Sequence, residues 1–220
     1  MRYKEALKLL CQTVDALYVS ATPIPRTLYL SLTGSREMSV INTPPKHRKP
    51  ILTQIAARTR EIVTDAIQAD RTRSGQVFYV YNNIAAIHQK ALFLKQLIPD
   101  IRVGITHGRM HESHIKKTIL DFQEQHFDVL LTTTIIENGI DIPNANTIIL
   151  DEVDRFGLAQ IHQLRGRVGR SDRQAYAFLL YSDSKTLGQK AQKRLQAVKE
   201  YVALGSGCLL YTSPSPRDDR

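Results

Sequence analysis

Short apolar runs separated by stretches of helical spacing dominate the middle of the chain. The runs are Val77 to Tyr81, Ile101 to Thr106, Phe127 to Leu131, Thr147 to Leu150 and Ala175 to Tyr181. Apolar runs that lack regular polar alternation are typical of strands with both faces buried, as in a parallel sheet. The pattern therefore predicts several parallel strands.

Helical stripes lie between these runs. Their apolar positions are Ile84, Ile87, Ala91, Leu94 and Ile98 after the first run, and Ile115, Ile119 and Phe122 after the second. Strands that alternate with helices form a doubly wound α/β domain through right-handed crossovers. We expect helices on both faces of the sheet.

Changes in composition divide the chain into parts. Residues 43–50, TPPKHRKP, are polar, basic and rich in proline, which is typical of a linker. Residues 1–42 are interpreted as the tail of one domain, and residues 51–183 as a complete α/β domain. Residues 184–207 contain a predicted helix. Residues 208–220, CLLYTSPSPRDDR, are rich in disorder-prone residues, and we interpret them as a sequence artefact.

Charge and cysteine content narrow the functional classes. A net charge of +9 and a pI near 9.6 favour an anionic partner, and nucleic acid fits best. Cys11 and Cys208 are far apart, so they predict neither a disulfide framework nor a metal cluster, and we expect a reducing cytosol. No uncharged apolar run reaches the roughly 18 residues of a membrane span. We expect no signal peptide and no membrane partner.

The sequence QLRGRVGR at residues 163–170 is the densest candidate for chemistry. If it is helical, Arg167 and Arg170 share one face. Arginine stays charged and can hold phosphate oxygens through paired hydrogen bonds. Each glycine inside a helix costs about 1 kcal/mol relative to alanine, which a merely solvated surface has no reason to carry. We predict a phosphate-binding cluster, with solvated arginines as the simpler alternative.

Further candidates follow the predicted strands. His107, Gly108 and Arg109 follow one strand, and the segment from Thr133 to Asp141 follows the next. Ligands of parallel sheets bind beyond the carboxyl ends of the strands. We therefore expect one edge of the sheet to collect both loops together with the arginine cluster.

Several of these residues also have simpler interpretations. Asp141, in the turn that begins at Gly139, can accept hydrogen bonds from two ribose hydroxyls, but stabilising its own turn explains it equally well. The sequence HESH from His111 to His114 is one residue shorter than the zinc signature H-E-x-x-H, so we predict no metal ligands.

No phosphate-binding loop is present in the sequence. None of the 11 glycines is followed by lysine, as the loop G-x-x-x-x-G-K-[ST] requires. The strand and carboxylates at residues 147–152, TIILDE, look like a magnesium site but lack that loop as a partner, so we interpret them as structural. The chain alone is not expected to hydrolyse ATP.

Three sequences resemble the third, fifth and sixth conserved motifs of superfamily 2 helicases and translocases. They are SATPIPRTL from Ser20, TTTIIENGIDIP from Thr132 and QLRGRVGR from Gln163. With RFGLAQIHQLRGRVGRS and AQKRLQAV, the chain is most similar to the bacterial transcription-repair coupling factors, and RecG-type helicases are near relatives. The resemblance covers about residues 1–207.

This resemblance implies a RecA-like fold and a set of roles. It implies catalysis for Gln163, Arg167 and Arg170, nucleotide binding for Gly139 and Asp141, DNA-backbone contacts for His107, Gly108, Arg109 and Thr133, and coupling for Ser20, Ala21 and Thr22. It also implies that residues 184–207 begin a helical hairpin that pulls on DNA.

The same resemblance implies partners and a cofactor. ATP with Mg²⁺ would be held mainly by a first RecA-like domain, of which residues 1–42 would be the tail. Double-stranded DNA would be the substrate, and RNA polymerase a partner of the longer protein. The chain is then expected to be a fragment of an ATP-dependent translocase that is inactive alone.

Two alternatives stay open. A RecG-type replication-fork helicase would share every motif quoted above. A stand-alone basic DNA-binding module would have no motor role, and replacing Arg167 and Arg170 would then weaken DNA binding. In a motor, the same changes would instead abolish ATP hydrolysis and leave DNA binding nearly unchanged.

Overall fold

A computed structural model of the chain divides into two compact units, Met1–Met38 and Ser39–Arg220. The structure describes residues 39, 49–137 and 142–182, together with residues 188, 189, 192, 193 and 196. The predicted domain tail, most of the linker, most of the helix after residue 183 and the final 13 residues lie outside the described residues.

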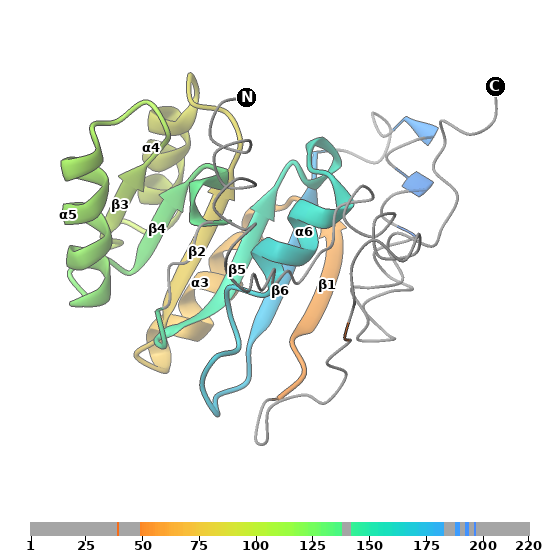
Figure 1. Ribbon diagram of the computed structural model, residues 1–220, viewed down its shortest axis with the longest axis horizontal. Coiled ribbons are helices and arrows are strands. Elements are labelled where there is room, and N and C mark those ends of the chain that lie inside the picture. The colour runs from red at the N-terminus through yellow and green to blue at the C-terminus, as the bar shows by residue number, and fades with distance from the viewer. Residues whose placement is uncertain are drawn as a thin grey trace, which may run out of the picture. The chain divides into compact units, whose positions relative to one another are not determined.

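Within the described residues, one sheet of six parallel strands forms the centre of the second unit (Figure 1). The strands are β1 (Leu52–Ala57), β2 (Gln76–Tyr81), β3 (Val103–Thr106), β4 (Val129–Thr132), β5 (Ala145–Asp151) and β6 (Tyr176–Tyr181). Their order across the sheet is β1-β6-β5-β2-β4-β3. The predicted doubly wound parallel sheet is confirmed, and each predicted strand is present with its ends shifted by two residues or fewer.

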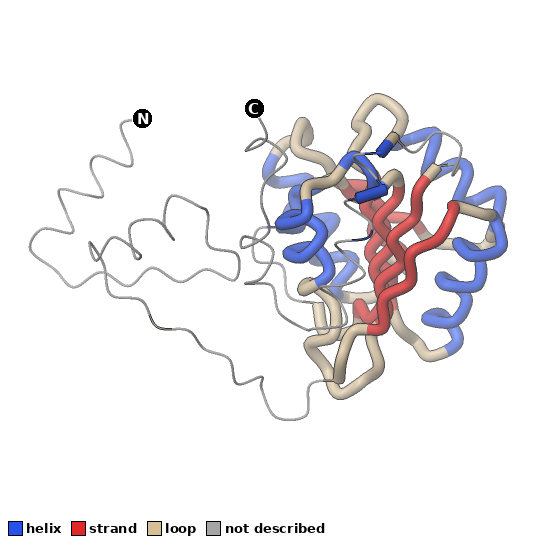
Figure 2. Tube along the Cα trace, turned by 90° about the vertical axis from the view of Figure 1, so that its right-hand side faces the viewer, coloured by secondary structure: helices blue, strands red, loops and turns tan. Residues whose placement is uncertain are grey.

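Helices cover both faces of this sheet (Figure 2). They are α3 (Arg60–Thr72), α4 (Ile87–Leu97), α5 (Glu112–Gln123), α6 (Leu158–Arg165) and the short 3₁₀ helices η1 (Thr134–Glu137) and η2 (Val153–Arg155). Apolar residues of α3 and α4 pack in one core, whereas Phe122 of α5 and the buried residues of α6 belong to the core on the other face. None of the described helices combines the length and the apolar character that a bilayer span requires.

The strand β1 and the helix α3 are not among the elements that the sequence predicts. β1 is an edge strand with an exposed Leu52, so no continuous apolar run marks it. α3 does carry a regular stripe, with Val63, Ala66 and Ile67 buried, and Thr59 caps it by accepting a hydrogen bond from the Ile62 N–H at 3.2 Å. That stripe and cap are a sufficient sequence signal for α3.

Candidate functional site

The carboxyl ends of β3 and β4 lie side by side, so the two loops that follow them start from adjacent points. Thr106 pairs with Thr132 in the sheet, and their hydroxyl oxygens are 3.0 Å apart in a buried hydrogen bond. The N–H of Thr133 donates to the Thr106 carbonyl at 3.4 Å. Thr133 itself is only 4% exposed, so little of it is open to a ligand.

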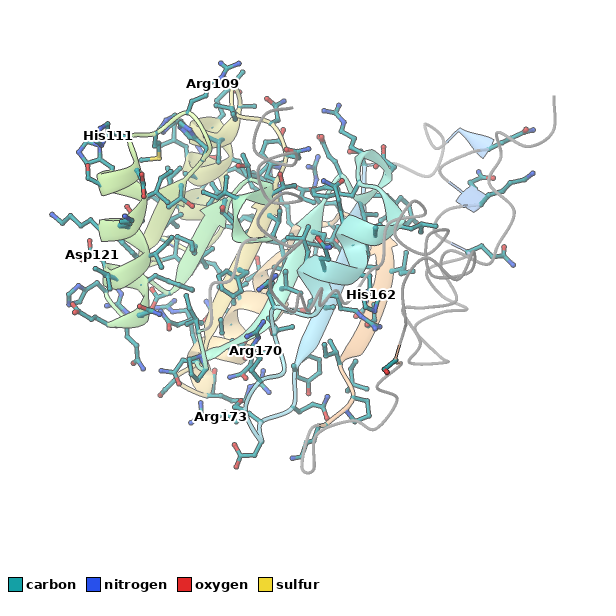
Figure 3. The ribbon with its side chains drawn as sticks, in the orientation of Figure 1. Arg109, His111, Asp121, His162, Arg170 and Arg173 are labelled. Atoms are coloured by element: carbon teal, nitrogen blue, oxygen red, sulfur yellow. The ribbon has the colours of Figure 1, made fainter. Side chains whose placement is uncertain are left out.

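The loop after β3 presents a cation at this edge. The N–H of Met110 donates to the His107 carbonyl at 3.0 Å, which closes the turn. Gly108 and Arg109 are exposed, and Figure 3 shows Arg109 at the carboxyl end of the sheet. The His107 ring is half-buried and meets the ring of His88 edge-on, with centroids 6.4 Å apart. The predicted meeting of the β3 and β4 loops is confirmed for their described parts, and residues 138–141 lie outside the described residues.

The predicted helical face of arginines is not present. Helix α6 ends at Arg165, and the cap residue Gly166 donates to the carbonyls of the last turn. Gly169 then has φ of +73°, a left-handed conformation that favours glycine. Arg167 and Arg170 therefore lie in the turn after the helix, and the glycines serve that turn.

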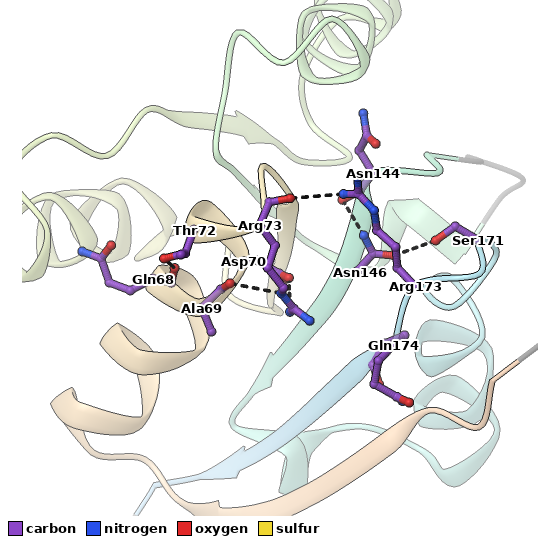
Figure 4. A network of polar contacts seen from close by, with 11 residues as sticks. Gln68, Ala69, Asp70, Thr72, Arg73, Asn144, Asn146, Ser171, Arg173 and Gln174 are labelled. Carbon is purple, nitrogen blue, oxygen red and sulfur yellow. Dashed lines mark hydrogen bonds and ion pairs between the residues drawn. The ribbon is translucent and has the colours of Figure 1, made fainter.

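The predicted position of the arginine cluster is also wrong. Ser171 Oγ donates to Asn146 Oδ1 at 3.0 Å, near the start of β5. Arg173 Nη1 donates to the carbonyl of Arg73 at 3.2 Å, just before β2 (Figure 4). Figure 3 accordingly shows Arg170 far from the loop after β3. Because β5 and β6 are parallel, α6 must return the chain to the amino edge of the sheet, and the arginines follow it there.

The structure describes some of the predicted site residues and not others. Arg170 is exposed, whereas Arg167 and Gln163 are partly buried, and all three interact with other residues of the chain. The predicted residues outside the described ranges are Ser20, Ala21, Thr22, Gly139 and Asp141.

A buried ion-pair network at the carboxyl edge is not among the sequence predictions. Asp151, at the end of β5, is 0% exposed. Lys90 Nζ lies 2.7 Å from its Oδ2, and Arg58 Nη1 lies 3.1 Å from both carboxylate oxygens. The Tyr79 hydroxyl donates to Oδ2 at 2.8 Å. The carboxylate that ends the TIILDE strand is therefore engaged by cations of the protein itself.

The surroundings of Asp151 shift the pKa values of two of its partners, Tyr79 and Arg58. Burial, and then the charge of Asp151, raise the pKa of Tyr79 well above its ordinary value, so its hydroxyl stays a donor. Burial alone would lower the pKa of Arg58, but the attraction and hydrogen bond of Asp151 outweigh it and the pKa is raised. In sequence, Arg58 and Lys90 look like ordinary surface cations, so only the carboxylate at a strand end could have suggested the network.

His162 makes stability depend on pH. Burial, and then the nearby Arg165, lower the pKa of His162 below its ordinary value of 6.5, so the unfolded chain binds the proton more readily. The stability contribution of His162 is complete above about pH 6.5 and is lost as pH falls through the folded pKa.

We expect His162→Gln to lose less stability than wild type between neutral and mildly acidic pH. Urea midpoints of both proteins at both pH values measure this, and equal losses would contradict it.

Comparisons with known proteins identify the family. Residues 42–172 match the family model of the helicase conserved C-terminal domain, and the chain belongs to this family. It is similar to the transcription-repair-coupling factor of Staphylococcus epidermidis, with 48% identity over 207 residues, which cover 94% of this chain and 18% of that relative. The chain thus spans about a fifth of the length of its curated relatives.

Solved structures show the same fold. RecG bound to a three-way DNA junction matches with a TM-score of 0.75 and 34% identity, over 94% of this chain and 28% of that chain. The helicase Lhr of Mycobacterium smegmatis, bound to single-stranded DNA and AMP-PNP, matches with a TM-score of 0.68 and 15% identity, over 91% of this chain and 28% of that one. The predicted RecA-like fold and the resemblance to coupling factors and RecG are confirmed.

Proposed function

We propose that this chain is the second RecA-like domain of an ATP-dependent translocase on double-stranded DNA, of the transcription-repair coupling type. The observation that carries the proposal is the separation of two cationic segments. An exposed loop with Arg109 lies at the carboxyl edge of the sheet, and the turn with Arg167 and Arg170 lies toward the amino edge. A DNA translocase needs two such surfaces, because it must bind DNA and a nucleotide at the same time.

The carboxyl edge is the proposed DNA surface. The loop from His107 to Arg109 is held by buried hydrogen bonds at its base and is exposed at its tip. Because the backbone at the base of this loop is already ordered, a contact between Arg109 and a backbone phosphate would order little besides its own side chain. The similarity to RecG, solved with a three-way DNA junction, supports this assignment.

The arginine turn is the proposed nucleotide surface. ATP and Mg²⁺ would be held mainly by a first RecA-like domain, because this sequence has no phosphate-binding loop. Arg167 and Arg170 would reach the γ-phosphate from this side, and Gln163 would order the pocket. Gly139 and Asp141 would bind the nucleotide, with Asp141 at its sugar. The chain alone would not turn over ATP.

The similarity to coupling factors extends the proposal to the longer protein. RNA polymerase would be its partner, and the bacterial cytoplasm its location. Movement along DNA would follow from opening and closing of the cleft between the two RecA-like domains as ATP is hydrolysed.

Replacing Arg109 with alanine tests the DNA surface. We expect the affinity of the 220-residue chain for a short duplex to fall for all sequences alike. The slope of log K against log salt should become shallower by about 0.9, because one phosphate contact is lost. The control is Lys95→Gln, an exposed charge in the last turn of α4, away from this edge. Equal binding by wild type and Arg109→Ala would contradict the proposed surface.

A further inference from the structure

A cavity of about 400 Å³ opens at the carboxyl edge, between the start of α3 and the first half of α4. None of the predicted site residues lines it. The lining residues that matter here are Arg58, Arg60, Tyr81, Gln89, Lys90 and Phe93.

The cavity has an excess of positive charge. Three of its lining residues, Arg58, Arg60 and Lys90, are cationic, and none is acidic. Asp151 beneath them pairs with Arg58 and Lys90 but supplies only one negative charge. Within the described part of the chain, the side chain of Arg60 has no hydrogen-bond or salt-bridge partner, and its charge interacts only weakly with the neighbouring Glu61. The lining of the cavity therefore carries more positive charge than Asp151 balances.

Two of the cations are held in place before any ligand arrives. The ammonium of Lys90 lies 4.6 Å from the ring centroid of Tyr81 and 5.4 Å from that of Phe93. Arg58 is held by both oxygens of Asp151. Because these side chains are already ordered, a ligand would lose little free energy in immobilising them.

The nearest acid in the sequence offsets only part of this charge. Glu61, the acid closest in sequence, is exposed and is not a lining residue. Its carboxylate accepts hydrogen bonds from its own backbone N–H and from Thr59, and these lower its pKa, with a smaller contribution from the charge of Arg60. The first turn of α3 is thus capped locally, and the cavity must attract anions through its side chains.

We propose that this cavity binds a phosphate group. The cavity is lined by donor groups from three places: Arg58 follows β1, Arg60 begins α3, and Gln89 and Lys90 lie on α4. A phosphate offers more acceptor oxygens than a carboxylate and so can satisfy donors from several directions. A volume of about 400 Å³ also leaves room for the sugar to which a phosphate is attached.

We favour the DNA backbone as the source of this phosphate. This choice rests on the proposed function. The cavity and the Arg109 loop open at the same edge of the sheet. That edge spans five strand spacings from β1 to β3, or about 24 Å at about 4.8 Å each. Duplex DNA carries one charge per roughly 1.7 Å of its axis, so a duplex along the edge offers phosphates at both places.

The first arm of the test uses inorganic phosphate. Phosphate is titrated into the 220-residue chain at constant ionic strength, with chloride as the reference anion, and backbone amide shifts are followed by NMR. We expect saturable shifts around Arg58 and Arg60 in the wild type and in the control Lys95→Gln. Arg60→Gln should lose them, and so should Gln89→Glu, which adds a negative charge. Absence of a phosphate-specific response in the wild type would overturn the proposal.

The second arm uses a short DNA duplex and separates the two sources. If the backbone occupies the cavity, Arg60→Gln makes the salt slope shallower by about 0.9 and Lys95→Gln does not. If phosphate binds but both cavity variants bind the duplex as wild type does, the cavity takes a free phosphorylated ligand and the DNA assignment is overturned.

The outcomes also distinguish this proposal from the proposed function. If Arg109→Ala weakens duplex binding while Arg60→Gln changes neither the phosphate response nor the duplex binding, the cavity proposal is wrong and the DNA surface stands. If the wild type binds no duplex, the DNA surface is wrong, and the phosphate titration alone decides the cavity.

Discussion

Replacing Arg170 with alanine, in a protein that joins this chain to a first RecA-like domain, is expected to lower ATP turnover by about 10³ to 10⁵-fold. An arginine supplied from a second domain neutralises the charge that develops on the transferred phosphoryl group. Arg170 is exposed in the turn after α6, so it can reach across a domain boundary. Arg167, three residues earlier, is expected to show an effect of the same order. Steady-state ATP hydrolysis with saturating duplex DNA measures both.

The same variants should bind DNA nearly as the wild type does. The arginine turn and the loop after β3 lie toward opposite edges of the sheet, so losing Arg170 removes no contact from the DNA surface. Arg173→Ala is the matched control, because Arg173 lies in the same segment but binds the carbonyl of Arg73. Weaker DNA binding with a shallower salt slope in Arg170→Ala would favour the stand-alone DNA-binding module. If Arg173→Ala loses as much ATP turnover as Arg170→Ala, Arg170 has no specific role in hydrolysis.

Asp151→Asn is expected to lower the free energy of unfolding by about 3 to 5 kcal/mol, as when one partner of a buried ion pair is removed. The change keeps the size of the side chain but leaves Arg58 and Lys90 facing a neutral amide. Their side chains are only 29% and 11% exposed, so water cannot fully replace the lost carboxylate. Urea or guanidinium unfolding at neutral pH measures the difference.

A surface ion pair provides the matched control for this variant. Glu112 and Lys116 are joined at 2.7 Å on α5, with side chains 78% and 71% exposed. Glu112→Gln is expected to leave the unfolding midpoint nearly unchanged, because water screens an exposed pair. If Asp151→Asn costs as little as this control, the buried network does not stabilise the fold in the way proposed.

Most of the sheet could be predicted because a strand that is buried on both faces appears in the sequence as a continuous apolar run. β2 and β5 are fully buried, and their apolar residues are visible in the sequence without knowledge of their neighbours. β1 has no such run, since an edge strand exposes part of its side chains. The meeting of the loops after β3 and β4 was also predictable, because successive parallel strands end at the same edge of a sheet.

The sequence by itself determined the family, the parallel α/β class and the loops at the carboxyl edge, because motif spacing and apolar periodicity are local properties. The tertiary structure alone decided where the arginine turn lies, since that depends on the return path of α6 and on the left-handed backbone at Gly169. Only the tertiary structure showed that Arg58 contacts Asp151, which lies 93 residues away in the chain. Their contact depends on the order in which β1, β6 and β5 pair, and no local periodicity encodes that order.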